Sequence, residues 1–168
     1  MGKILKVDLT TKTIKKEPID EEVAKKYLGG KGYATYLLYR YLKEYKRKGI
    51  SPADIDPLGP ENVLIFATGP GTGVPGFPSS GRYHVMALKS PLTGSIGSGN
   101  SGGEWGPFLK FAGFDIVIIE GASDTPVYLE IVNGEAELKS AEDLWGKNTF
   151  DTNRILKERV KGKNVSVT

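Results

Sequence analysis

Glycine is concentrated in one part of this 168-residue chain, and that concentration limits what the chain can fold into. The chain has 22 glycines, roughly twice the usual share of about 7%. Half of them, 11, fall between Gly69 and Gly106, and residues 62–109 carry only three charged side chains, Arg82, Lys89 and Glu104. Apolar strands interrupt the segment, so it is not a low-complexity linker. We interpret it as backbone that approaches a flat or phosphorylated ligand, where side chains would obstruct contact.

The apolar pattern predicts an α+β fold, β-rich, with mixed or antiparallel sheets and a few short helices. Strands are expected at residues 63–68, 83–89 and 115–120, and hairpins at 3–17 and 127–139, the second turning at Asn133-Gly134. Helices are expected at 20–28 with Asp20 as N-cap, at 34–48, at 107–112, and at 149–161 with Thr149 as N-cap. Residues 164–168 are expected to begin a further strand.

The chain contains no cysteine and one histidine, His84. Without cysteine it cannot form disulfides, zinc knuckles or cysteine-ligated iron–sulfur clusters. With one histidine it cannot build a histidine-rich metal site, and any Ser-His scheme would depend on that side chain. The length predicts a single domain over residues 1–168, large enough to bury its own core.

The formal charge of +3 is unevenly distributed, because residues 1–50 carry 13 basic and 6 acidic side chains. This excess favours a solvated basic helix face over nucleic-acid binding, since no RNA-binding or recognition-helix motif accompanies it. The longest apolar runs, 63–67 and 116–119, are far shorter than a membrane span. The first residues lack the pattern of a secretory signal. We therefore expect a cytoplasmic protein that binds neither nucleic acid nor membranes.

Residues Gly97–Gly102 match the G-x-G-x-x-G fingerprint of nucleotide-binding proteins. Seven residues, 90–96, separate it from the preceding strand, whereas the fingerprint needs a tight turn there. The glycine N–H groups of 97–103, with Asn100 and Ser101, could instead form an anion-binding nest. Arg82 adds a planar fork of donors suited to phosphate. A phosphate-bearing cofactor is favoured, while plain tight turns and a nucleotide site remain alternatives.

Other candidate residues have a structural interpretation beside the functional one. A general base at His84 is conceivable, but a structural or surface histidine is favoured. Glu104 could bind a metal or a ligand hydroxyl, although a carboxylate facing solvent is the simpler interpretation. Trp105 and Trp145 are interpreted as packing residues and not as ligand platforms.

Several segments resemble the N-terminal domain of the tungsten-containing aldehyde:ferredoxin oxidoreductases. The string KSPLTG…NSGG…LKFAGFD is the most specific part of this resemblance, which runs in order along essentially the whole chain. The segments that carry it are residues 3–11 (KILKVDLTT), 24–38 (AKKYLGGKGYATYLL), Asp56–Pro70, Ser80–Gly121 and Asp143–Phe150 (DLWGKNTF).

The resemblance implies a β-rich base that carries a tungsten bis-molybdopterin cofactor, with Mg²⁺ bridging the two pterin phosphates. Arg82 would contact the pterin, and Asn100, Ser101 and Gly102 would contact its phosphates. The backbone carbonyl of Asn100 would help to hold the Mg²⁺. The family's 4Fe–4S cluster and its acid–base residues belong to later domains, so no residue of this chain is expected to be catalytic.

We therefore expect the first part of the tungstopterin-binding domain of an aldehyde:ferredoxin oxidoreductase, as a fragment or as a separate subunit. The complete enzyme would oxidise aldehydes to carboxylic acids and pass electrons to ferredoxin, and the isolated chain is expected to be inactive. Its partner would be the rest of the oxidoreductase or a catalytic subunit. The alternative from a different class is a non-catalytic binding or assembly module that dimerises or pairs with a catalytic subunit.

Overall fold

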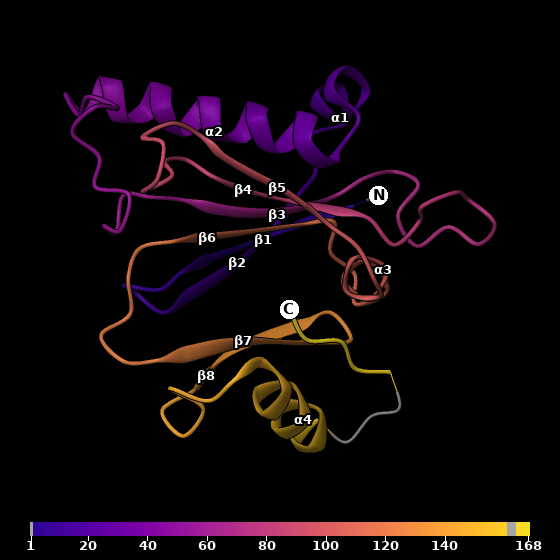
Figure 1. The fold of residues 1–168 in the computed structure, drawn as a ribbon. Coiled ribbons are helices and arrows are strands. Elements are labelled where there is room, and N and C mark those ends of the chain that lie inside the picture. The colour runs from indigo at the N-terminus through magenta and orange to yellow at the C-terminus, as the bar shows by residue number, and fades with distance from the viewer. Residues whose placement is uncertain (1, 161–163) are drawn as a thin grey trace.

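A six-stranded mixed sheet lies at the centre of the computed structural model, which describes residues 2–160 and 164–168 (Figure 1). Its strand order is β2-β1-β6-β3-β4-β5. Strands β1 and β6 run parallel, and the other neighbouring pairs are antiparallel. The strands are β1 (Lys3–Asp8), β2 (Thr13–Pro18), β3 (Leu64–Thr68), β4 (Tyr83–Ala87), β5 (Gly97–Ser101) and β6 (Ile116–Glu120).

Two helices, α1 (Glu21–Tyr27) and α2 (Gly30–Arg47), cover one face of this sheet. Helix α1 begins as predicted, because the side chain of Asp20 accepts hydrogen bonds from the backbone N–H groups of Glu22 and Val23. The predicted apolar stripe of α2 faces the sheet, and Leu37 and Leu38 are buried there. Burial of this stripe fixes the helix over β3 and β4.

The opposite face is covered by α3 (Trp105–Phe111) and by a hairpin of β7 (Val127–Val132) and β8 (Glu135–Ser140). The predicted hairpin turn is confirmed, since Asn133 and Gly134 both have positive φ angles, 49° and 88°. Helix α4 (Thr149–Arg159) packs on the outer side of the hairpin through Leu156.

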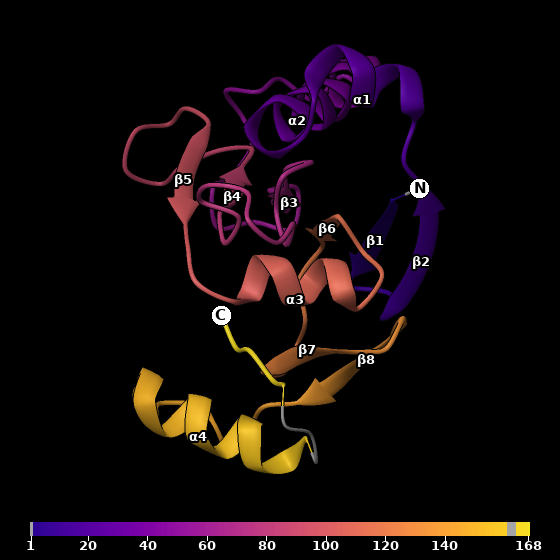
Figure 2. The ribbon, with the colours of Figure 1, turned by 90° about the vertical axis from the view of Figure 1, so that its right-hand side faces the viewer.

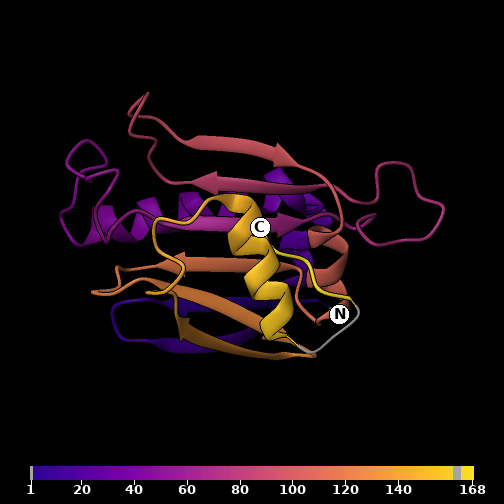
Figure 3. The same ribbon diagram turned by 60° about the horizontal axis from the view of Figure 1, so that its bottom comes forward.

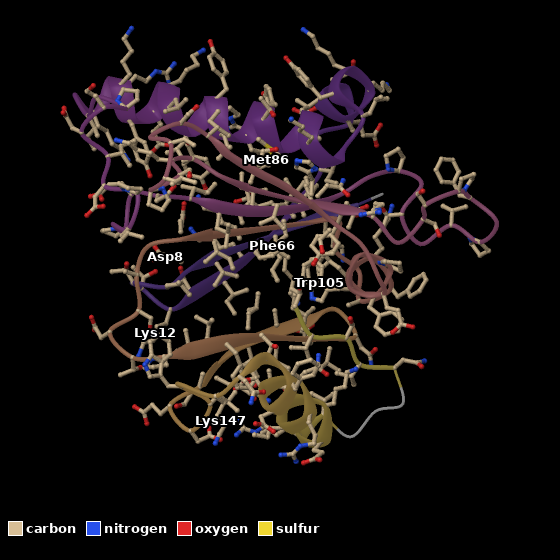
Figure 4. All side chains as sticks on the ribbon, in the orientation of Figure 1. Asp8, Lys12, Phe66, Met86, Trp105 and Lys147 are labelled. Atoms are coloured by element: carbon tan, nitrogen blue, oxygen red, sulfur yellow. The ribbon has the colours of Figure 1, made fainter. Side chains whose placement is uncertain are left out.

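Strand β6 is buried from both sides, as its unbroken apolar sequence predicts. Ile116 and Ile118 pack under the helices, whereas Val117 packs against the hairpin layer. Figure 4 shows the same alternation elsewhere in the sheet: Met86 lies on the helix side, and Phe66 on the other side with Trp105. Side chains two residues apart on one strand therefore share a face, which places the side chains of β4 and β5.

The layer formed by the β7–β8 hairpin and α4 leaves part of the sheet uncovered. Figure 3 shows the hairpin in front of β1 and β2 and α4 crossing in front of β3 and β6, while β4 and β5 extend beyond them. Figure 2 looks along the sheet and shows β5 at its outer end, beside α3 and below α2. Strand β5, which belongs to the glycine-rich segment, thus lies at an exposed edge of the sheet.

Three expectations need correction. The N-cap of α4 is Asn148 and not Thr149, because the side chain of Asn148 accepts a hydrogen bond from the N–H of Asp151. The predicted end of this helix, Lys161, lies outside the described residues. Residues 164–168 form no strand. Trp145 is 78% exposed and is not a packing residue. Within the described ranges, no helix is long and apolar enough to cross a membrane.

Candidate functional site: the free edge of β5

The expected glycine nest is wrong for most of its length. Residues Gly97–Ser101 form β5, paired antiparallel with β4. A strand directs successive N–H groups to opposite sides, whereas a nest needs them to converge. The nucleotide fingerprint also lacks its turn between strand and helix, and β5 and β6 are not neighbours in the sheet.

The strand instead presents backbone groups along a free edge. On the other side of β4, the N–H of Leu88 donates to the carbonyl of Val63 at 3.0 Å. The backbone N–H and C=O groups of alternate residues on a strand point to the same neighbouring strand. Those of His84 therefore point to β3, like those of Leu88. On β5, the residue paired with His84 is Asn100. The backbone N–H and C=O groups of Asn100 and of Ser98 therefore point away from β4. No further strand of the described chain lies beyond this edge.

Four polar side chains lie in a row along β4 and β5, from Arg82, just before β4, to Ser98 near the start of β5. Arg82 Nη1 donates to Asn100 Oδ1 at 3.2 Å. The Nδ2 of Asn100 lies 3.5 Å from Nδ1 of His84, and Nε2 of His84 lies 2.9 Å from Oγ of Ser98. The structure thus brings together Arg82 and Asn100, two of the residues predicted from sequence, through their side chains. It adds His84 and Ser98 to them.

Glycines bring the backbones around this row into contact. A β-carbon on Gly81 would lie 2.4 Å from the carbonyl oxygen of Gly103, so only glycine permits this approach. A β-carbon on Gly102 would lie 3.4 Å from Cζ and Nη1 of Arg82, which places the guanidinium directly over that glycine. Gly102 therefore belongs to the site, whereas Ser101 lies opposite Tyr83 on the other face of the strand pair.

The site is electropositive. Burial, and then the positive charge of Lys31, hold the pKa of His84 below its ordinary value. Lys31 lies in the first turn of α2, which has no acidic residue and no side-chain cap at Gly29. The N-terminus of a helix carries partial positive charge, so α2 and Lys31 both favour an anion on this side of the sheet. This feature is not among the site residues predicted above, although the run GGKG at residues 29–32 marks it in the sequence.

The other candidates lie outside this row. Glu104 is exposed at the start of α3 and makes no capping hydrogen bond. Trp105 is a packing residue, as predicted, with its ring 5.3 Å from Phe66 and 4.7 Å from Tyr83 between ring centres. Among the described residues, no group of three histidine, cysteine, aspartate or glutamate side chains could hold a metal ion. A cation at this site would therefore depend on backbone carbonyls and on the ligand itself.

Comparison with known sequences matches residues 4–168 to one family, described as aldehyde ferredoxin oxidoreductase, N-terminal domain. The chain belongs to this family. A tungsten-containing aldehyde ferredoxin oxidoreductase of Pyrococcus abyssi is 51% identical over 99% of the chain. An aliphatic sulfonate oxidoreductase, WOR-like subunit, of Pyrococcus furiosus is 38% identical over 95% of it.

A solved structure shares the fold of this family member. It is the active site complex BamBC of benzoyl coenzyme A reductase in complex with 1,5-dienoyl-CoA, with a TM-score of 0.82 and 34% identity over 95% of this chain. The α+β fold expected from sequence is therefore confirmed. The chain spans about a quarter of these proteins, 26% and 24% of the two relatives and 23% of the structural neighbour.

Proposed function

We propose that this chain is the tungstopterin-binding N-terminal domain of an aldehyde:ferredoxin oxidoreductase. Residues 1–168 would be one domain, corresponding to the first part of the β-rich domain that carries the cofactor in this family. The free edge of β5 is the observation that carries the proposal. It combines outward backbone groups, an exposed guanidinium and glycines without side chains, which is the surface that a flat, phosphorylated ligand needs.

The relatives support a role in binding the cofactor and not the substrate. Their names refer to aldehydes, to an aliphatic sulfonate, to glyceraldehyde-3-phosphate and to benzoyl coenzyme A. The glyceraldehyde-3-phosphate enzyme matches 55% of this chain, and the other three match 95% or more of it. A domain shared by enzymes with such different substrates is suited to binding a cofactor that these enzymes have in common. The names of several relatives specify tungsten.

The residues at the edge fit the phosphates of such a cofactor. One N–H of Arg82 is used by Asn100, so most of its guanidinium donors are available for a phosphate. The outward carbonyl of Asn100 can be a ligand of Mg²⁺, a cation that prefers oxygen and usually keeps phosphate and water ligands as well. Gly102 leaves room beside the guanidinium, and Lys31 adds positive charge.

Bound tungstopterin would supply the redox chemistry, the two-electron oxidation of an aldehyde with water to a carboxylic acid, two protons and two electrons. The part of this chain is to hold the phosphate end of the cofactor and so to fix its position. Arg82 would neutralise phosphate charge, and the carbonyl of Asn100 would help to hold Mg²⁺. Catalytic residues, the 4Fe–4S cluster and the contact with ferredoxin belong to the remainder of the enzyme or to a separate catalytic subunit.

Metal and pterin analysis tests this proposal. The chain is produced in a host that synthesises the cofactor, purified with any polypeptide that accompanies it, and assayed for tungsten and pterin. Arg82→Ala is expected to lower the pterin content, whereas Arg154→Ala, which changes an exposed arginine of α4, leaves it unchanged. Equal pterin content in Arg82→Ala and the unsubstituted chain would contradict the role of Arg82.

A further inference from the structure

The orientation of the Asn100 amide is determined by Arg82. A guanidinium has only donors, so the atom of Asn100 that faces Arg82 Nη1 at 3.2 Å must be the oxygen, Oδ1. The other end of the amide, Nδ2, then faces Nδ1 of His84 at 3.5 Å. Because the amide nitrogen donates, Nδ1 of His84 has to accept and carries no hydrogen.

The remaining hydrogen of the imidazole is therefore on Nε2. From there it donates to Oγ of Ser98, 2.9 Å away. The four side chains form a chain of hydrogen bonds with one direction, from Arg82 through Asn100 and His84 to Ser98. A proton on Nδ1 would place two donors face to face and break this chain at its middle.

We infer that His84 is a positioning residue for the phosphate site: its Nδ1 holds the Asn100 amide, and that amide holds the guanidinium of Arg82 at the free edge of β5. This inference rests on the proposed function, in which Arg82 and Asn100 bind the cofactor phosphates. His84 itself contacts neither the phosphate nor the cation.

Holding Arg82 in place before a ligand binds lowers the entropy cost of binding. Arg82 is exposed, and a free arginine side chain loses considerable rotamer entropy when a ligand immobilises it. A guanidinium that Asn100 already holds loses less. Asn100 is exposed as well, and its second hydrogen bond, to His84, keeps its amide from rotating away. Affinity for phosphate should therefore depend on His84, two residues after Arg82 in the sequence.

Two substitutions of His84 separate its two hydrogen bonds. In His84→Asn, the side-chain oxygen can take the place of Nδ1 and accept from Asn100. In His84→Gln, the longer side chain can place its amide nitrogen near the position of Nε2, which keeps the bond to Ser98 and leaves Asn100 without its acceptor. The second variant retains more side-chain volume, so a role in packing alone predicts the opposite order of effects.

Calorimetric titration with pyrophosphate in the presence of Mg²⁺ measures the result. We expect His84→Asn to bind within about threefold of the unsubstituted chain and His84→Gln to bind about tenfold more weakly, the loss of one hydrogen bond that supports a charged group. Equal affinities in His84→Gln and the unsubstituted chain would overturn the inference, as would equal losses in the two variants. Melting temperatures of both variants establish that they are folded.

The tautomer of His84 gives a second readout that needs no ligand. Nitrogen-15 NMR of the imidazole should show hydrogen on Nε2 in the unsubstituted chain and a mixture of tautomers in Arg82→Ala, because the Asn100 amide is then free to turn. Hydrogen on Nδ1 in the unsubstituted chain would overturn the inference. If the chain shows this tautomer but binds no pyrophosphate, the proposed phosphate site fails, and the hydrogen-bond chain is retained as a structural feature only.

Discussion

A β-carbon on Gly81 would lie 2.4 Å from the carbonyl oxygen of Gly103, so the segment that enters β4 touches the segment that leaves β5 through backbone alone. This contact closes the end of the strand pair where Arg82 reaches Asn100. The position of the guanidinium thus depends on a glycine that precedes it in sequence.

Gly81→Ala should destabilise the protein, by about 1–3 kcal/mol, because the new methyl group meets backbone that cannot move aside cheaply. Gly99→Ala is the matched control, since a β-carbon there has no neighbour within 4 Å. Urea denaturation measures both. A free energy of unfolding lowered equally in the two variants would mean that the contact between the two segments is not tight.

Tyr41→Phe should lower the free energy of unfolding by about 1–2 kcal/mol. The hydroxyl of Tyr41 donates to Glu120 Oε2 at 2.8 Å, and Glu120 Oε1 is 3.0 Å from Nζ of Lys6. Burial and this hydrogen bond raise the pKa of Tyr41, as expected for a hydroxyl held in its neutral form. Tyr39→Phe, at a residue that is 57% exposed, should change the free energy of unfolding little. A similar loss in both variants would contradict the stabilising role of the Tyr41 hydroxyl.

Asn148→Ala should destabilise α4 by about 1 kcal/mol, because its side-chain oxygen accepts from the N–H of Asp151 at 2.9 Å. Thr149→Ala should have an effect within about 0.5 kcal/mol, since Thr149 is an exposed residue inside the helix. Thermal unfolding of the two variants distinguishes the caps, and a larger loss in Thr149→Ala would restore the assignment made from sequence.

The stability of the protein should fall as the pH drops below about 6.5. Burial and then Lys31 hold the pKa of His84 below its ordinary value of 6.5, so the unfolded chain takes up the proton at a higher pH than the folded protein. The free energy of unfolding therefore decreases from pH 6.5 down to the pKa of the folded state. Because His84 is the single histidine, NMR reports its pKa without ambiguity. The decrease should be absent in His84→Asn, and a folded-state pKa above 6.5 would contradict this account.

Most strands and helices could be predicted from sequence because their apolar residues recur at the spacing of a strand or a helix. The exception is β5, whose five residues, GSGNS, have no apolar side chain and no strand propensity. It is a strand because its backbone completes the ladder of β4, an effect that no side-chain pattern records. The predicted nest at residues 97–103 was wrong for this reason.

The candidate site could be predicted only in part. Arg82 and Asn100 were chosen for their chemistry, and the structure joins them by a hydrogen bond. The role of His84 depends on the register of β4 against β5, which places it opposite Asn100, and register cannot be obtained from either strand alone. The N-cap of α4 could not be predicted for a similar reason. Asn148 and Thr149 are both common N-cap residues, and backbone geometry decides between them.

Mapping where phosphate and Mg²⁺ bind tests the central claim most directly. Backbone amide signals of the 168-residue chain, and the side-chain Nε–H signal of Arg82, are followed by NMR during titration with pyrophosphate and Mg²⁺. Changes should concentrate at Ser98, Asn100 and Gly102 and at the Nε–H of Arg82, and Arg82→Ala should weaken the apparent affinity about tenfold. Unchanged signals along β5, with changes confined to the cationic outer face of α2 around Arg40, Lys43 and Arg47, would contradict the claim.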